Sequence, residues 1–120
     1  MKTIFVVDDI ITNLLMAEKA LSDHYEVHTM LSASTMFELL DNVLPDLILL
    51  DIMMPDINGF DALKQLKADT RYAEIPVIFL SSKNDTATAN LSFEIGGIDF
   101  IEKPFTEPDL LSRLTTILGH

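Results

Sequence analysis

The chain has 120 residues, of which 48% are hydrophobic, and it carries a formal net charge of −11 with no cysteine. This length fits a single hydrophobic core, so we expect one domain over residues 1–120. The eight basic residues are too few to follow a phosphate backbone, which argues against direct nucleic-acid binding. The missing cysteines exclude disulfides, thiolate metal sites and thiol nucleophiles.

No apolar run approaches the roughly 20 residues that a membrane-spanning helix needs. The first residues of the chain also lack the charged and apolar regions of a secretory signal peptide. We therefore expect a cytoplasmic protein without a membrane partner.

Short apolar runs alternate with segments of helical periodicity along the whole chain. The runs predict strands at residues 3–7, 25–30, 47–50, 77–80 and 98–101. The periodic segments predict a helix after each strand, with Ser32 or Ser34 capping the second helix and Pro45 stopping it. The third helix is expected from about residue 59 to 68, and the fourth, after the polar stretch 83–90, has the weakest apolar pattern.

The helix faces expected to turn inward are those with recurring apolar residues. They carry Ile11, Leu14, Leu15 and Leu21 in the first helix, Met36, Phe37, Leu39, Leu40 and Val43 in the second, Phe60, Leu63 and Leu66 in the third, Ala87, Leu91 and Ile95 in the fourth, and Leu110, Leu111, Leu114, Ile117 and Leu118 in the fifth.

Five β-α repeats of this kind predict an α/β fold: a parallel sheet covered by helices on both faces and joined by right-handed crossovers. Ligands of such folds bind at the carboxyl ends of the strands. The residues expected at those ends share polar or charged side chains: Asp8, Asp9, Asp51, Ser81, Ser82 and Lys103.

Three clustered carboxylates repel one another and therefore either take up protons or gather around a cation. Oxygen-only donors favour Mg²⁺ or Mn²⁺ over zinc and copper. A carboxylate such as Asp51 can also attack phosphorus and form an acyl phosphate, while Lys103 and Ser81 offer an ammonium and a hydroxyl to phosphoryl oxygens. These residues predict phosphoryl-transfer chemistry at Asp51.

Four motifs resemble the receiver domain of two-component response regulators, of the chemotaxis-regulator type. Residues 6–9 with Asn13 resemble its acidic pair, residues 49–55 with Gly59 its phosphoacceptor loop, residues 76–81 its switch strand, and residues 99–105 its lysine motif. The resemblance extends over essentially the whole chain. It implies a flavodoxin-like (βα)5 fold, doubly wound, with a five-stranded parallel sheet in the order 2-1-3-4-5.

The resemblance also implies a role for each matching residue. Asp51 would be phosphorylated, and Mg²⁺ would be held by Asp9, Asp51, the backbone carbonyl of Met53 and, through water, Asp8. Lys103 would contact the phosphoryl group, and its bond to Pro104 would be cis. Ser81 would move to bond the phosphoryl oxygen, and Phe100 would swing into the space it leaves.

Three positions depart from the commonest form of the family: Ser81 replaces threonine, Phe100 replaces tyrosine, and Ser82 stands where alanine or glycine is usual. We expect function to survive all three changes. They leave the lifetime of the phosphoryl group open, as do Met53 and Lys83, whose side chains flank the site in receivers.

The function predicted is a signalling switch. It would take its phosphoryl group from a histidine kinase or phosphotransfer protein and then change how the face formed by the fourth helix, fifth strand and fifth helix binds an output domain or a downstream protein. A phosphorylation-independent docking module is the alternative. A turnover phosphatase is a weaker reading, because Met53 stands where such enzymes carry a second acid. Homodimerisation through the same face, motivated by Asp99 and Arg113, is a further hypothesis.

Overall fold

The computed structural model describes residues 1–82 and 86–119. Strands and helices alternate along this part of the chain, as the sequence predicts. The strands are β1 (Thr3–Val7), β2 (Glu26–Met30), β3 (Leu47–Asp51), β4 (Val77–Ser81) and β5 (Asp99–Glu102). The helices are α1 (Ile11–Leu21), α2 (Ala33–Leu40), α3 (Gly59–Ala68), α4 (Thr86–Glu94) and α5 (Glu107–Leu118). The start of the polar stretch 83–90 lies outside the described residues.

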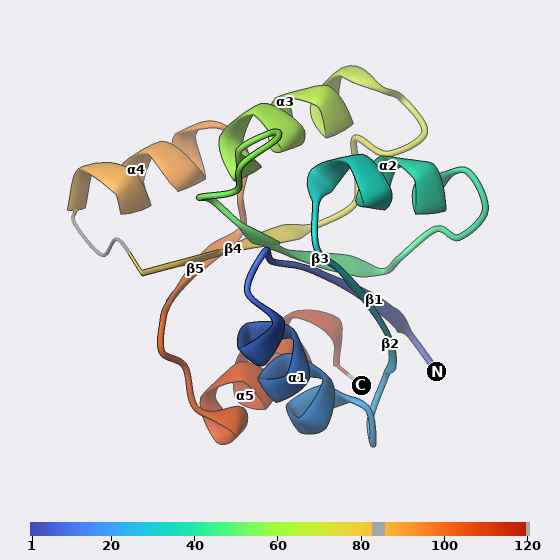
Figure 1. Ribbon diagram of the computed structural model, residues 1–120, viewed down its shortest axis with the longest axis vertical. Coiled ribbons are helices and arrows are strands. Elements are labelled where there is room, and N and C mark those ends of the chain that lie inside the picture. The colour runs from blue at the N-terminus through green and yellow to red at the C-terminus, as the bar shows by residue number, and fades with distance from the viewer. Residues whose placement is uncertain (83–85, 120) are drawn as a thin grey trace.

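The strands form one parallel sheet in the order β2-β1-β3-β4-β5. Figure 1 shows α2, α3 and α4 on one face of this sheet and α1 and α5 on the other. This confirms the predicted doubly wound α/β fold and its strand order. The register pairs Val7 with Leu50, Asp51 with Leu80 and Ser81 with Glu102, so the carboxyl ends of the inner strands meet along one edge.

The core has two parts because successive side chains of a strand point to opposite faces of the sheet. Phe5, Ile48 and Phe79 pack under α2 and α3, whereas Ile4 and Leu49 pack under α1 and α5. Every residue of β3 and β4 is buried. The sheet therefore holds the strand ends on a rigid base.

The inward face of α1 differs from the prediction. Ile11 and Leu15, expected to point inward, are 60% and 58% exposed, while Ala17 and Ala20 are buried with Leu14. Large apolar side chains lie on both sides of this helix, and the alanines form the buried side with Leu14. In α5 the prediction fails at Ile117 alone among its five residues, since this side chain is 37% exposed near the end of the helix.

The prediction for α4 is wrong at two of its three positions. Ala87 is exposed and Leu91 is 42% exposed, whereas Ile95, just beyond the helix, is partly buried as expected. The buried residue of α4 is Ser92, whose hydroxyl donates a 2.9 Å hydrogen bond to the carbonyl of Thr88 in the preceding turn. Small and polar residues therefore make the contact between this helix and the sheet.

Among the described residues, no helix is both long enough and apolar enough to cross a membrane.

Candidate functional site

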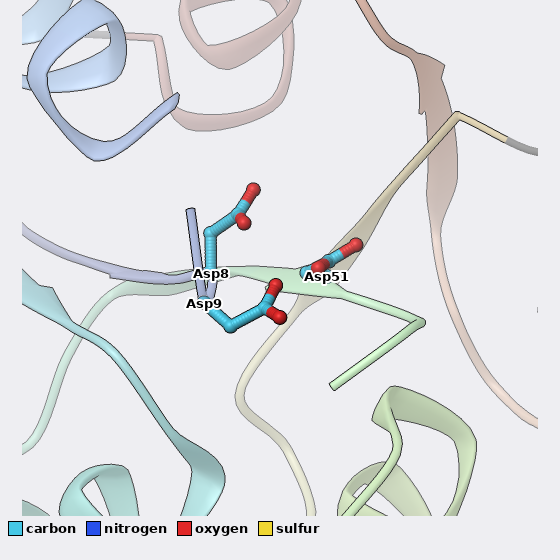
Figure 2. A group of neighbouring side chains, drawn as sticks. All are labelled: Asp8, Asp9 and Asp51. Carbon is cyan, nitrogen blue, oxygen red and sulfur yellow. The ribbon is translucent and has the colours of Figure 1, made fainter. Parts of the chain in front are cut away.

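Three carboxylates meet at the carboxyl edge of the sheet. Asp8 directly follows β1 and Asp51 ends β3, and these two strands are neighbours in the sheet. Figure 2 shows the side chains of Asp8, Asp9 and Asp51 gathered at this edge, and one oxygen of each lies within 4.8 Å of the others. Asp8 and Asp51 are buried, and Asp9 is exposed. The arrangement places negative charge in a poorly hydrated position that is open on one side.

The Asp8 carboxylate is held by three donors. Its Oδ1 accepts a hydrogen bond from the backbone N–H of Ile10 at 3.0 Å. Its Oδ2 accepts one from the Asn13 amide at 3.2 Å and lies 2.8 Å from the Lys103 ammonium. A fully buried carboxylate needs such partners because an unpaired charge in the interior is costly. Asp8 is therefore fixed in orientation.

Lys103, the residue that follows β5, bridges two of the acids. Its Nζ lies 2.8 Å from Asp8 and 3.0 Å from Asp51, and its side chain is only 9% exposed. Burial by itself would lower the pKa of Lys103, but the hydrogen bonds to Asp8 and Asp51 outweigh burial and raise the pKa above its ordinary value. Lys103 is therefore an ammonium. Its bond to Pro104 is cis, as the resemblance implies.

The Asp51 carboxyl has an unusual affinity for protons. Burial, followed by repulsion from Asp8, raises its pKa from 3.8 to about 6, although Lys103 pulls it in the opposite direction. The folded protein therefore holds Asp51 in an environment that disfavours its charge. An added cation at this edge would relieve that cost.

The loop after β3 is folded tightly back onto the end of its strand. The N–H of Gly59 donates a 2.8 Å hydrogen bond to the Ile52 carbonyl, and a Cβ added at Gly59 would lie 2.4 Å from the backbone oxygen of Asp51. This close approach gives the physical reason for glycine there, which the sequence alone does not supply. The Met53 side chain, 63% exposed, points away from the core.

The same loop is tied to α2 by a contact that the sequence did not predict. The hydroxyl of Ser34 donates a 2.7 Å hydrogen bond to Asp56, and this bond is the first cause of a lowered Asp56 pKa. The cap of α2 is Ser32, one of the two candidates, whose side chain accepts from the N–H of Thr35. No local pattern signals the Ser34–Asp56 pair, because its partners belong to different β-α units.

Ser81 and Phe100 lie on the side of the site that faces α4. Ser81 ends β4 and is buried, and its carbonyl accepts a 2.8 Å hydrogen bond from the N–H of Lys103. A cavity of about 140 Å³ beside it is lined by residues that include Ser81, Thr88 and Phe60. Phe100, on β5, is half-buried and packs against the core under α3. The two residues therefore connect the acidic edge with the α4 side of the molecule.

Asp99 and Arg113, expected to pair between two copies of the chain, are joined within one chain. Nη1 of Arg113 lies 3.1 Å from both carboxylate oxygens of Asp99 and 3.3 Å from the Phe100 carbonyl. This contact links β5 to α5.

Comparison of the sequence with models of known protein families identifies the family of this chain. Residues 4–115 match the model of the response regulator receiver domain. The chain belongs to that family. This confirms the resemblance to receiver domains that the four sequence motifs indicate.

The curated relatives are much longer proteins. The chain is 36% identical over 118 residues to a probable cyclic di-GMP phosphodiesterase of Vibrio cholerae, covering 98% of this chain and 27% of that protein. It is 35% identical over 115 residues to the response regulator PleD of Caulobacter vibrioides, covering 95% of this chain and 25% of that one. The receiver domain thus spans about a quarter of the length of these relatives.

Solved receiver structures have the same fold. The chemotaxis protein CheY4 of Vibrio cholerae superimposes with a TM-score of 0.92 at 26% identity, covering 98% of this chain and 99% of that one. The BeF3-activated receiver domain of DrrB, a Thermotoga maritima protein, superimposes with a TM-score of 0.90 at 29% identity, covering 100% of this chain and 99% of that one.

Receiver domains are the phosphorylation-dependent switches of two-component signalling, so the predicted class of function is confirmed. The family binds Mg²⁺ at an acidic pocket, and the receiver domain has an aspartate cluster of that kind. Nothing among the described residues favours the phosphorylation-independent docking module.

Proposed function

We propose that this receiver domain accepts a phosphoryl group on Asp51 from a histidine kinase or phosphotransfer protein. The observation that carries the proposal is the position of Asp51, which lies 3.0 Å from the buried Lys103 ammonium and within the cluster of three carboxylates. An anion approaching three acids alone would be repelled, whereas the ammonium supplies an attraction directed at the nucleophile.

The donor atoms fit Mg²⁺, and Mn²⁺ as its substitute. Carboxylate oxygens of Asp9 and Asp51 and the backbone carbonyl of Met53 would hold the ion, which would neutralise charge on the phosphoryl oxygens. Asp8 would act through water, because Ile10, Asn13 and Lys103 already occupy its carboxylate. The absence of histidine and cysteine from the cluster favours these hard cations over zinc.

In the transfer step an Asp51 carboxylate oxygen attacks phosphorus. The new bond is O–P, and the bond between phosphorus and the donor nitrogen breaks, leaving its electron pair on the donor imidazole. A pKa of about 6 keeps most of Asp51 ionised at neutral pH, as a nucleophile must be. Lys103 holds the phosphoryl oxygens as charge develops on them. In dephosphorylation a water oxygen would attack the phosphorus and the bond between phosphorus and Asp51 would break, which restores the carboxylate and releases inorganic phosphate. The protein would thus act on its own phosphoryl group and not turn over an external substrate.

The signal would pass from Asp51 through Ser81 to Phe100. The Ser81 backbone is held by the N–H of Lys103, so its response to a phosphoryl oxygen is a rotation of its side chain. Phe100 would move into the space that the hydroxyl leaves, and the face of α4, β5 and α5 would change its affinity for partners. The partner would be an output domain or a separate downstream protein.

The other properties expected from the sequence belong to the same proposal. Residues 1–120 would act as one cytoplasmic receiver domain that does not itself contact nucleic acid. Homodimerisation through α4, β5 and α5 is a hypothesis motivated by Asp99 and Arg113, and light scattering that still finds a monomer after phosphorylation would exclude it.

The test is the intact mass of the protein after incubation with acetyl phosphate, with Mg²⁺ or with EDTA. Wild type should gain one phosphoryl group only with Mg²⁺, and Asp51→Asn should gain none. Asp61→Asn, which removes an exposed carboxylate from the start of α3, is the matched control and should behave as wild type. A folded wild type that gains nothing under any condition would favour the docking module.

A further inference from the structure

A groove runs along the free edge of the sheet beside β2. Its volume is about 490 Å³, and its lining includes residues 27–30 of β2, Glu18 of α1, and Glu38 and Leu39 of α2. Because β2 is the outer strand of the sheet, this groove borders a strand with a partner on one side only. Figure 1 shows that α1 and α2 flank this edge from opposite faces of the sheet.

The backbone of β2 offers hydrogen-bonding groups to the groove. The N–H of Glu26 donates to the carbonyl of Lys2 at 2.9 Å, so Glu26 and every second residue after it face β1. The N–H and C=O groups of Val27 and Thr29 therefore point away from β1. Within residues 1–82 and 86–119 no strand lies on that side of β2. An added strand would pair with these groups.

The charged side chains around the groove indicate which kind of segment can bind there. Glu18 and Glu38 are exposed on either side of the edge. Among residues 1–82 and 86–119, no lysine or arginine lines the groove. The edge of a second copy would bring the same carboxylates into contact with these, so like-charge repulsion opposes self-pairing. A basic segment has the complementary charge.

We propose that the edge of β2 binds an extended segment of a partner protein in which two adjacent basic residues are flanked by apolar ones. Neighbouring side chains of a strand point to opposite faces of the sheet, so one cation reaches Glu18 and the next reaches Glu38. The flanking apolar side chains cover Val27 and Leu39, which are half-buried in the wall of the groove. This interaction is separate from phosphoryl transfer, since the site at Asp51 lies on a different edge.

The direct test uses two synthetic peptides, acetyl-Thr-Val-Lys-Lys-Val-Thr-amide and its counterpart with two glutamates in place of the lysines. Each is titrated into the ¹⁵N-labelled protein at a saturating Mg²⁺ concentration, which occupies the acidic cluster. The lysine peptide should shift the amides of Val27 and Thr29 and slow their hydrogen exchange, while the bonded amide of Glu26 keeps its exchange rate. The glutamate peptide should do neither.

Two sets of variants separate backbone pairing from charge. Thr29→Pro removes an outward N–H and should abolish binding, whereas Thr29→Val keeps that N–H and should bind as wild type. Glu18→Gln and Glu38→Gln should each weaken binding about two- to fivefold, as expected for exposed ion pairs. Thermal unfolding of every variant shows whether the fold is retained. If a variant does not fold, hydrogen exchange measured on the wild-type protein with each peptide still tests the proposal.

Three results would overturn the proposal. They are equal binding of the two peptides, shifts centred on Asp8, Asp9 and Asp51 instead of β2, and unchanged exchange at Val27 and Thr29 in the presence of saturating lysine peptide.

Discussion

The hydroxyl of Ser34 is bonded to the carboxylate of Asp56 across two β-α units, at 2.7 Å. It fixes the loop that carries the Met53 carbonyl, which we propose as a ligand of Mg²⁺. We expect Ser34→Ala to weaken Mg²⁺ binding about two- to fivefold, since one hydrogen bond to a charged group contributes about 1 kcal/mol in an exposed position. Isothermal titration with Mg²⁺ measures this.

The matched control is Ser32→Ala, which removes the cap of α2 but no contact to the loop. It should lower the free energy of unfolding by about 1 kcal/mol and leave the affinity for Mg²⁺ unchanged. Equal affinities of wild type and Ser34→Ala would show that the bond does not position the loop.

The raised pKa of Asp51 predicts how stability depends on pH without metal. The folded state binds the Asp51 proton more tightly than the unfolded state does, so the stabilising contribution is fully present below pH 3.8 and is lost as the pH rises through about 6. Asp51→Asn has no such loss. The advantage of this variant over wild type should therefore grow between pH 4 and 7, by on the order of 2–3 kcal/mol.

Urea unfolding in EDTA across this pH range measures the difference. Asp23→Asn, which removes an exposed acid from the turn after α1, is the control for the loss of one carboxylate. A difference between Asp51→Asn and wild type that does not change with pH would mean that burial leaves the proton affinity of Asp51 unaltered.

Lys103 and a divalent cation would compete for Asp51, which lies 3.0 Å from the ammonium and which we propose as a ligand of the metal. Replacing the ammonium by an apolar chain, Lys103→Met, should leave Asp8 and Asp51 without their cation and lower the metal-free stability by about 3 kcal/mol. The same variant should bind Mg²⁺ more tightly than wild type and yet gain phosphoryl groups from acetyl phosphate at least tenfold more slowly.

The opposite signs of these two effects make the prediction specific. Weaker Mg²⁺ binding in Lys103→Met would show that the lysine orders the acids for the metal instead of competing with it. Lys19→Met, which removes an exposed lysine paired with Glu107, is the control and should change neither quantity.

Gly59 has no room for a side chain. A Cβ there would lie 2.4 Å from the Asp51 carbonyl oxygen and 2.9 Å from the Cα of Ile52, both of them backbone atoms. Gly59→Ala should therefore destabilise the fold by about 1–3 kcal/mol and slow phosphorylation, because the strand end must shift. Gly119→Ala has free space around its Cβ but a φ of +78°, so it should cost only about 1 kcal/mol and leave phosphorylation unchanged.

The acidic edge could be predicted because its signals are local. Asp8 and Asp51 each follow an apolar run directly, and Lys103 is separated by one residue from the run that ends at Ile101. In a parallel sheet the ends of such runs meet at one edge. What the sequence could not supply is the pairing of side chains that the chain brings together from far apart, such as Lys103 with Asp8 or Ser34 with Asp56.

The errors in the helices have a common physical origin. Periodicity identifies an apolar stripe but not which of two stripes is buried, and in α1 the exposed Ile11 and Leu15 compete with Leu14 and Ala17. In α4 the small Ser92 is buried and the larger Leu91 is 42% exposed. Burial is decided there by the space available beside β4 and β5, which the sequence of the helix does not contain.

The three charged groups closest together in the site come from β1, β3 and the end of β5, so they share no local segment of the chain. A partly folded chain in which β5 has not yet joined the sheet has the two acids side by side without the ammonium. Under the proposed function, rapid phosphorylation would therefore require that β5 has joined the sheet. If Asp51 is phosphorylated as proposed, a mass shift after incubation with acetyl phosphate would report, molecule by molecule, that β1, β3 and β5 have reached their places in the sheet.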